Sequence, residues 1–414
     1  MTEFNWAGNL AYSVDAVAEP STRDELRTLV ASASAVRALG SRHSFNRIAD
    51  TAGLLVSTAG LPARVSIDAA RRIARVAGGM RYGEVARALQ ANGWALGNLA
   101  SLPHISVAGA IATGTHGSGD RNGSLATAVA GVEILTADGD IRMLRRGEPG
   151  FNGAVVSLGA LGIVLDVDLD IEPAYEIAQT VYERVAWEDA LVDLSAVTSL
   201  GYSVSMFTTW RDADTVDQVW VKARTDAGPA PASVLGASPA SAQRHPLPGE
   251  AADSTTPQRG VAGAWLDRLP HFRLEFTPSR GAELQTEYFV SRRDAPDAIR
   301  ALKVFAPRLG DLLLVNEVRT IAADELWLSG AYGRDTVGLH FTWRPDQPAV
   351  EALLTEIEAA LAPFDPRPHW GKVFTMPTDV IRSRYPRIDD FAALRAEFDP
   401  RGVFRNDYVA ALGL

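Results

Sequence analysis

The chain has 414 residues, 47% hydrophobic and 22% charged, which is globular and too long for one ordinary core, so we expect two domains. Its formal net charge of −10 argues against nucleic acid as a partner, because nucleic acid requires basic patches. The absence of cysteine excludes disulfides, thiolate catalysis and cysteine-bound metals.

The first part of the chain, to about residue 172, alternates short strands with short helices. A helix is predicted to begin at Ser21 or Thr22, since a capping residue precedes acidic residues there. The following strands and helix are expected at 72–77 (strand), 82–92 (helix), 131–136 with 140–144 (hairpin) and 163–171 (strand). The last of these carries acids at alternate positions, Asp166, Asp168 and Asp170, so we expect it to be half exposed.

From about residue 173 the strands become longer and richer in aromatic residues. Strands are predicted at 202–210, 218–222, 286–290 and 339–343, and helices at 296–302 and 350–361. Residues 225–260 are rich in Ala, Pro, Ser and Gly, which predicts a long irregular surface loop. Short helices return after about residue 373. We therefore expect an α+β protein with one domain formed by 1–172 and 373–414 and a second domain, with an antiparallel sheet, formed by 173–372.

Several features bear on location and assembly. No apolar run reaches the roughly 18–20 residues of a membrane span, and no signal peptide opens the chain. We therefore expect a cytoplasmic protein without membrane contact. No heptads occur and cysteine is absent, which leaves a monomer as the expected state. The seven histidines show no HxH or HxxxH spacing, so no metal site is predicted.

Two stretches rich in small residues lie in the first part, at 40–45 (GSRHSF) and 97–120. Small residues leave backbone N–H groups uncovered, so such loops can approach a flat or anionic group. From the residues alone, His43 can equally be a solvated loop histidine, and the second stretch can serve close helix packing. No GxGxxG follows an N-terminal strand and no GxxxxGK[ST] occurs, which disfavours a Rossmann site and a P-loop. Two such loops in one domain do suit a large phosphorylated cofactor.

Four segments together resemble a known family: 38–44 (ALGSRHS), 76–79 (VAGG), 107–117 (VAGAIATGTHG) and 157–163 (SLGALGI). Over nearly its whole length the chain is similar to FAD-dependent oxidoreductases of the vanillyl-alcohol oxidase/p-cresol methylhydroxylase type. The resemblance implies a two-domain FAD-binding fold with an antiparallel-sheet substrate (cap) domain. It also implies that His43 is bonded covalently to the flavin.

The resemblance assigns further cofactor-binding positions. They are Gly40, Ser41, Arg42, Ser44, Phe45, Ala100, Ser101, His104, Val107, Gly109, Ala110, Thr113, Gly114, Thr115, His116, Gly162, Ile163, His369 and Asn406. Ala100 would lie where oxygen approaches the flavin, and a small side chain there favours an oxidase over a dehydrogenase.

Polar residues late in the chain indicate a substrate side. Glu317 and Arg319 are two apart in a strand and share a face, as do His340 and Thr342. On the residues alone, these pairs can be an exposed ion pair and a polar stripe on a half-exposed strand. Lys372, which follows Trp370 closely, is one of only three lysines.

Within the family, these residues are most similar to those of alditol oxidases. That resemblance implies that Ser101, Gln285, Glu317, Arg319, Thr342 and Lys372 bind a polyol, and that Glu317, Arg319, His340 and Lys372 are catalytic.

The implied reaction oxidises the C1 hydroxyl of xylitol or sorbitol to an aldose by hydride transfer to flavin N5, and O2 becomes H2O2. Arg319 and Lys372 would polarise the hydroxyl, and Glu317 would fix neighbouring hydroxyls and hold Arg319. His340 and Lys372 both qualify as proton acceptor, Lys372 only if its pKa is depressed. The alternatives are a sugar-1,4-lactone oxidase or dehydrogenase of the same family, and a non-catalytic flavin- or sugar-binding relative.

Overall fold

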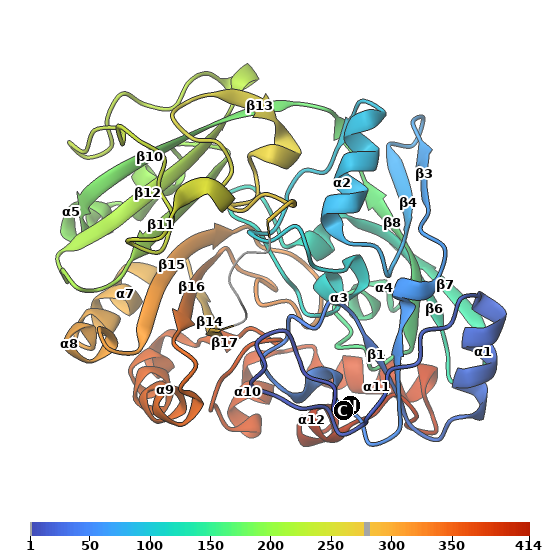
Figure 1. Cartoon of the computed structure of the whole chain (residues 1–414). Coiled ribbons are helices and arrows are strands. Elements are labelled where there is room, and N and C mark those ends of the chain that lie inside the picture. Colours follow the sequence, from blue (N-terminus) through green and yellow to red (C-terminus); the bar gives the residue numbers. More distant parts are fainter. Residues whose placement is uncertain (1, 277–281) are drawn as a thin grey trace.

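The computed structural model describes residues 2–276 and 282–414, and its strands form two main sheets (Figure 1). The smaller one, in the first part of the chain, is antiparallel throughout. Its strands, in spatial order, are β3 (Val65–Asp68), β4 (Ile73–Ala77), β8 (Ile163–Asp170), β6 (Val129–Leu135) and β7 (Ile141–Arg145). The predicted hairpin is β6–β7, in which Leu135 pairs with Ile141.

The other elements of this part surround that sheet. They are the parallel pair β1 (Val36–Leu39) and β2 (Leu54–Ser57), the pair β5 (Trp94–Ala95) and β9 (Glu172–Pro173), and the helices α1 (Arg23–Ser32), α2 (Tyr82–Ala91), α3 (Val107–Ala112) and α4 (Phe151–Ala154). The predicted start of α1 is confirmed, because the side chain of Thr22 accepts a hydrogen bond from the backbone N–H of Glu25.

The expectation that strand β8 is half exposed is wrong for Asp166. Its side chain is 1% exposed, because three arginines from neighbouring segments cover it. Arg23 and Arg75 lie 2.8 and 3.0 Å from Oδ2, and Arg64 contacts the same oxygen. The acid is therefore compensated within the fold and does not face solvent.

The larger sheet has eight strands among the described residues and is antiparallel at every pairing. In spatial order they are β13 (Ala262–Ala264), β10 (Glu176–Ala186), β12 (Thr215–Arg224), β11 (Ser203–Thr208), β15 (Leu313–Ile321), β16 (Thr336–Trp343), β14 (Leu284–Ser291) and β17 (Arg367–Pro368). The predicted α+β class, the antiparallel sheet and the two predicted helices are confirmed. The helices here are α5 (Trp187–Val192), α6 (Leu194–Thr198), α7 (Ala295–Lys303), α8 (Ala306–Leu309) and α9 (Gln347–Leu361).

The two faces of this sheet differ because side chains alternate along each strand. In β16, Val337, Leu339 and Phe341 belong to one apolar core with the residues of helices α7 and α9. These helices cover the outer face of the sheet (Figure 1). His340 and Thr342 point to the opposite face, toward the middle of the molecule. The packed face therefore makes a rigid backing for polar side chains on the other.

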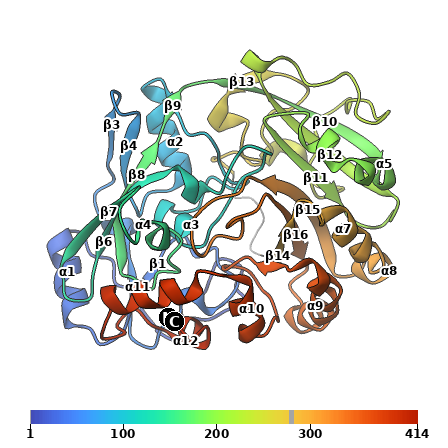
Figure 2. The same ribbon diagram turned by 180° about the vertical axis from the view of Figure 1, so that it is seen from behind.

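The last part of the chain packs with the smaller sheet and the helices around it, which together are called the first body. Helices α10 (Thr378–Arg384), α11 (Ile388–Phe398) and α12 (Asp407–Ala411) contribute to the core that also holds α2, α3 and the smaller sheet. Both termini lie near one another beneath this body (Figures 1 and 2). The division at residues 172 and 373 stays a prediction, since this core also includes Tyr175, Trp265 and Leu328 from the range 173–372.

The segment 225–260 is irregular, as predicted, with only the short 3₁₀ turns Thr225–Ala227 and Ala252–Ser254. It is more than a surface loop, because residues 245–247, 250, 251 and 254 line the central cavity. None of the helices in the described part of the chain combines the length and the apolar character that a membrane crossing requires.

Candidate active site

A cavity of about 780 Å³ lies between the polar face of the larger sheet and the loops of the first body. Most of the predicted site residues line it. They are Gly40, Ser41, Arg42, His43, Ser44, Phe45, Ala100, Ser101, Gly109, Ala110, Thr113, Thr115, His116, Gly162, Ile163, Gln285, Glu317, Arg319, His340, Thr342, His369 and Lys372. His43 and Arg319, which are 276 positions apart in the sequence, thus line the same cavity because the two bodies face each other.

Four predicted cofactor residues do not line this cavity. His104 turns away and its Nε2 bonds the carbonyl of Leu274 at 2.9 Å. Val107 is fully buried in the core of the first body, and Gly114 serves the turn after α3 with φ +68°. Asn406 caps α12 and donates to the carbonyl of Asp50 at 2.8 Å, which ties the C-terminal segment to the first body.

The backbone conformation and backbone hydrogen bonds of the turn at 40–45 fix its position beside the cavity. Arg42 adopts a left-handed conformation, with φ +64°, and its carbonyl accepts from Trp6 at 2.9 Å. At the end of the turn, the N–H of Phe45 donates to the carbonyl of Gly371 at 2.7 Å. Within the described residues, the backbone N–H groups of His43 and Ser44 find no protein acceptor. Uncovered N–H groups in such a turn suit a phosphate.

His43 is held in a fixed orientation. Its Nδ1 lies 2.8 Å from the carbonyl of Ser41, so Nδ1–H is the donor, and its ring stacks on Trp6 at 4.8 Å. Burial lowers the pKa of His43 to about 4. The ring is therefore neutral at neutral pH, and its other nitrogen keeps a free lone pair. The alternative of a solvated loop histidine is wrong.

These residues fit FAD. The cavity is large, two loops of small residues border it, and the turn presents unpaired N–H groups and a neutral histidine to it. A Cβ added at Gly40 would collide with Oγ of Ser106, at the start of α3. Gly40 thus lets the turn and the second loop approach closely, as a shared cofactor site requires.

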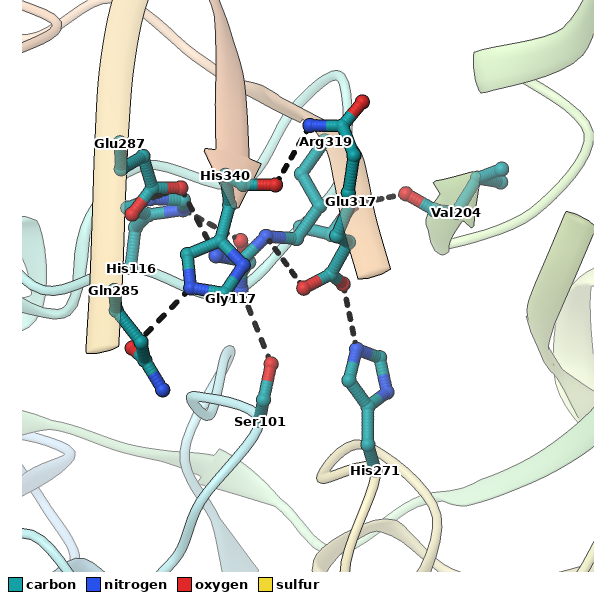
Figure 3. A network of polar contacts seen from close by, with 12 residues as sticks. Ser101, His116, Gly117, Val204, His271, Gln285, Glu287, Glu317, Arg319 and His340 are labelled. Atoms are coloured by element: carbon teal, nitrogen blue, oxygen red, sulfur yellow. Dashed lines mark hydrogen bonds and ion pairs between the residues drawn. The ribbon is translucent and has the colours of Figure 1, made fainter. Parts of the chain in front are cut away.

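The opposite wall is centred on Glu287, a residue the sequence analysis missed (Figure 3). Its carboxylate is 1% exposed and bonds three groups: Lys372 at 2.7 Å, Arg319 at 3.0 Å and His116 at 3.0 Å. Burial alone would raise the pKa of Glu287, but Lys372, His116 and Arg319 outweigh it and hold that pKa well below its ordinary value. Both ring nitrogens of His116 face oxygen atoms, on Glu287 and Gly117.

Arg319 joins this wall to the loop of the first body. Its Nη1 donates to Oγ of Ser101 at 3.1 Å, and its Nε lies 3.5 Å from Glu317. Glu317 and Arg319 are 4% and 6% exposed, so the alternative of an exposed ion pair is wrong. Burial would raise the pKa of Glu317, but Arg319 and His271 hold it below its ordinary value. Both side chains are therefore ionised in the site.

Glu317 also contacts His271, which lines the cavity, and through it Lys222, which does not; the sequence analysis missed both. Nε2 of His271 lies 2.7 Å from Glu317, and Nδ1 of His271 lies 3.0 Å from the ammonium of Lys222. His271 reaches in from a loop opposite the sheet (Figure 3). Lys222 is one of only three lysines in the chain, and that rarity could have drawn attention to it. Nothing in the sequence distinguished His271.

His340 lies between the two carboxylates, since it pairs with Glu287 across one strand boundary and with Glu317 across the other. Its Nε2 lies 3.2 Å from Oε1 of Gln285, and its Nδ1 has no partner among the described residues. Burial, followed by Lys372, holds the pKa of His340 well below its ordinary value, so the ring is neutral. His340 and Thr342 are both buried, so the alternative of a polar stripe on a half-exposed strand is wrong.

Lys372 meets the condition set for it from the sequence. Burial, and then Arg319, lower its pKa, although Glu287 acts in the opposite direction. Lys372 is the last residue of the turn His369–Lys372, in which its backbone N–H donates to the carbonyl of His369 at 3.0 Å. The ammonium is thus fixed against Glu287 at the edge of the cavity.

Two family models and several known proteins match this chain. An FAD binding domain model matches residues 14–145, and a D-arabinono-1,4-lactone oxidase model matches residues 280–412. An alditol oxidase of a Streptomyces species is 49% identical over 99% of this chain and 98% of its own length. An L-gulono-1,4-lactone dehydrogenase of Mycobacterium tuberculosis is 28% identical over 98% of this chain and 97% of its own.

Solved structures share the fold. A cholesterol oxidase of Brevibacterium sterolicum superposes with a TM-score of 0.81 over 99% of this chain and 96% of its own, at 14% identity. A solvent-stable cholesterol oxidase does so with the same TM-score over 100% and 97%, at 16% identity. With the family models and the close relative, these matches lead to one conclusion: the chain belongs to the alditol oxidase family, within the FAD-dependent flavoproteins of the vanillyl-alcohol oxidase type.

Proposed function

We propose that this flavin-dependent alcohol oxidase oxidises the terminal C1 hydroxyl of alditols, with xylitol and sorbitol as substrates. The observation that carries the proposal is the buried polar wall on one face of the larger sheet. It consists of the buried Glu287, Glu317, Arg319, His340 and Thr342, together with the half-buried Gln285. A polyol offers only hydroxyl groups, and a site that binds it needs many fixed donors and acceptors.

Arg319 and Lys372 supply positive charge at one place, since both bind the same carboxylate of Glu287. Oriented toward the substrate oxygen, they stabilise the negative charge that develops as the C1 hydroxyl loses its proton. Glu317 is ionised and accepts a hydrogen bond from a neighbouring hydroxyl.

His340 takes the hydroxyl proton in this proposal. Its ring is neutral and lines the cavity, whereas Lys372 is ion-paired as an ammonium with Glu287. A protonated amine cannot accept a further proton. Of the two residues that the sequence left open as proton acceptor, we therefore assign the base role to His340 and an electrostatic role to Lys372.

FAD would be held by the turn at 40–45 and the loop at 100–116, with His43 as the point of covalent attachment, and it would accept the hydride at N5 and return two electrons to O2. The overall reaction balances as one alditol and one O2 giving one aldose and one H2O2. Ala100 lines the cavity beside Ser101, and its small side chain leaves room for O2.

A second candidate is a sugar-1,4-lactone oxidase or dehydrogenase. The match of residues 280–412 to the lactone oxidase model favours it, because this range holds most of the polar wall. A lactone carries a ring carbonyl in place of one hydroxyl, so it leaves more of the wall's acceptors unpaired.

A substrate panel separates these candidates. The purified protein is mixed with xylitol, sorbitol and an aldono-1,4-lactone in air, and H2O2 and the organic product are measured. Equal amounts of aldose and H2O2 from the alditols, with little turnover of the lactone, support the proposal. Preferential lactone turnover refutes it, and flavin that no substrate reduces identifies a non-catalytic relative. The expected monomer is checked by light scattering, and the cytoplasmic location stays a prediction.

A further inference from the structure

A line of polar contacts leads from groups that line the cavity to one buried charged group that does not. It runs from Ser101 through Arg319 and Glu317 to His271, and ends at Lys222. Lys222 is 1% exposed, lies on β12 and does not line the cavity. The mechanism proposed above does not use it.

The contacts of Lys222 determine where the proton of His271 resides. Its ammonium is an obligate donor and faces Nδ1 of His271 at 3.0 Å, while it also donates to the carbonyl of Leu269. Nδ1 must therefore be unprotonated and accept. The single ring proton is on Nε2, which donates to Oε1 of Glu317 at 2.7 Å.

Other contacts keep the imidazole in this orientation. The rings of Phe207 and Trp220 meet it edge-on at 5.4 and 5.2 Å, and its backbone N–H donates to the carbonyl of Ser101 at 3.1 Å. The ring cannot turn over without leaving either Lys222 or Glu317 with an unpaired buried group, which is costly.

We infer that Lys222 is a positioning residue: by occupying Nδ1 of His271, it keeps the ring neutral and in place, so that Nε2–H holds Glu317 in the orientation that accepts a substrate hydroxyl. The inference rests on the proposed function in one respect, the role of Glu317 in binding the polyol. Lys222 itself touches neither substrate nor cofactor.

The charges around Lys222 agree with this role. Burial lowers the pKa of Lys222 to about 7, Glu317 raises it and Arg319 lowers it. Burial and, after it, the charge of Lys222 lower the pKa of His271 to about 4, although Glu317 acts to raise it. Replacement of Lys222 by an apolar residue removes that repulsion, raises the pKa of His271 and frees Nδ1. Nε2–H still donates to the ionised Glu317, but Nδ1 has lost its partner and can take up a second proton.

The test combines a spectroscopic and a binding measurement on the flavin-loaded protein. Histidine ¹⁵N resonances, with His271 assigned by its loss in His271→Gln, report the tautomer and, across pH, the protonation of Nδ1 in the unmodified protein and in Lys222→Met. Stopped-flow flavin reduction by xylitol without oxygen gives the dissociation constant and the limiting rate across pH. Lys303→Met is the matched control, because Lys303 forms only surface ion pairs with Glu188 and Asp214.

We expect the neutral Nε2–H form of His271 in the unmodified protein and a higher pKa for protonation of its Nδ1 in Lys222→Met. We also expect the dissociation constant for xylitol to rise about tenfold, the effect of one weakened hydrogen bond to a charged group, with the limiting rate changed less than about threefold. An Nδ1–H tautomer in the unmodified protein overturns the inference, as do an unchanged titration of Nδ1 and an unchanged affinity in Lys222→Met. If no alditol reduces the unmodified flavin, the proposed function fails, and the ¹⁵N measurement alone decides whether Lys222 positions His271.

Discussion

The ammonium of Lys372 lies 2.7 Å from Oε2 of Glu287, and the guanidinium of Arg319 lies 3.0 Å from Oε1 of the same carboxylate. One buried acid therefore brings together two cations from segments more than fifty residues apart in the sequence. The sheet supplies Glu287 and Arg319, and the turn after β17 supplies Lys372. The fold thus holds two positively charged groups at one carboxylate, as the proposed reaction requires.

Glu287→Gln leaves Lys372 buried without its counter-ion and leaves Arg319 with its longer ion pair to Glu317, at 3.5 Å. We expect activity to fall at least about a hundredfold and the free energy of unfolding to fall by ~3–5 kcal/mol. The pKa of Glu287 is held low, so its contribution to stability is present above its ordinary pKa of 4.5 and is lost as pH falls below that value. Urea unfolding across pH measures both effects, and the variant should lack the acid-dependent part.

Glu183→Gln is the matched control for that experiment. Glu183 also lies in the larger sheet, on β10, but its side chain is 35% exposed and pairs with Arg244 near the surface. The same substitution there should cost less than about 1 kcal/mol. A similar loss of stability at both positions would mean that the buried pairing has no special importance.

Gly338→Ala tests how closely the wall is packed. A Cβ at this position would lie 3.0 Å from Oε1 of Glu287 and 3.4 Å from the ring of His116. The carboxylate must then move by a few tenths of an ångström, which loosens its bonds to Arg319 and Lys372. We expect the rate of flavin reduction to fall about tenfold while the thermal midpoint changes little. An unchanged rate would show that the position of the carboxylate is not critical.

The division of roles between His340 and Lys372 predicts two different pH profiles. A base must be unprotonated, and the pKa of His340 lies well below its ordinary value of 6.5, so the rate of flavin reduction should decline only below that pH. His340→Asn should lower the rate by about 10²–10⁴ and remove this decline. Lys372→Met should lower the rate more than tenfold but keep the decline. A Lys372→Met variant within about threefold of the original rate would exclude its electrostatic role.

Covalent attachment at His43 predicts where the flavin goes after acid precipitation. In the unmodified protein, the yellow colour should stay with the pellet, and in His43→Ala free FAD should appear in the supernatant. His104→Ala is the control, because His104 bonds Leu274 and does not line the cavity, and its flavin should stay with the pellet. Free FAD from the unmodified protein would refute the covalent bond and leave the family assignment intact.

The buried lysine makes a separate prediction for stability. The folded-state pKa of Lys222 is lowered from 10.5 to about 7, so the unfolded chain binds more protons between these values and stability rises with pH there. The penalty of burying the ammonium is complete below pH 7 and disappears as pH rises to 10.5. The stability of Lys222→Met relative to the unmodified protein should therefore decline over this range. A difference independent of pH would contradict the lowered pKa.

Local patterns in the sequence predicted much of the fold and part of the site. Glu317 and Arg319 were recognisable because two residues apart in a strand means one shared face. The turn at His43 was recognisable from small residues after a strand. The hairpin β6–β7 followed from the Ala137–Gly139 turn and its flanking apolar runs.

Long-range pairing decided the rest and left no local signal. Glu287 is an isolated acid in an apolar strand, and its importance arises from Lys372, Arg319 and His116, which come from three other segments. The burial of Asp166 likewise depends on arginines from distant elements. Loop 225–260 had the composition of a surface loop, yet part of it lines the cavity, since composition does not record what a loop covers.

In the proposed reaction, an alditol delivers its C1 hydride to the flavin of this protein. The decisive measurement is an anaerobic titration of the flavin-loaded protein with xylitol, followed by the visible flavin absorbance. We predict that one equivalent of xylitol bleaches one flavin, that one equivalent of aldose forms, and that admitted air restores the colour with one H2O2. A flavin that stays oxidised with xylitol and sorbitol, but is bleached by an aldonolactone, would contradict it.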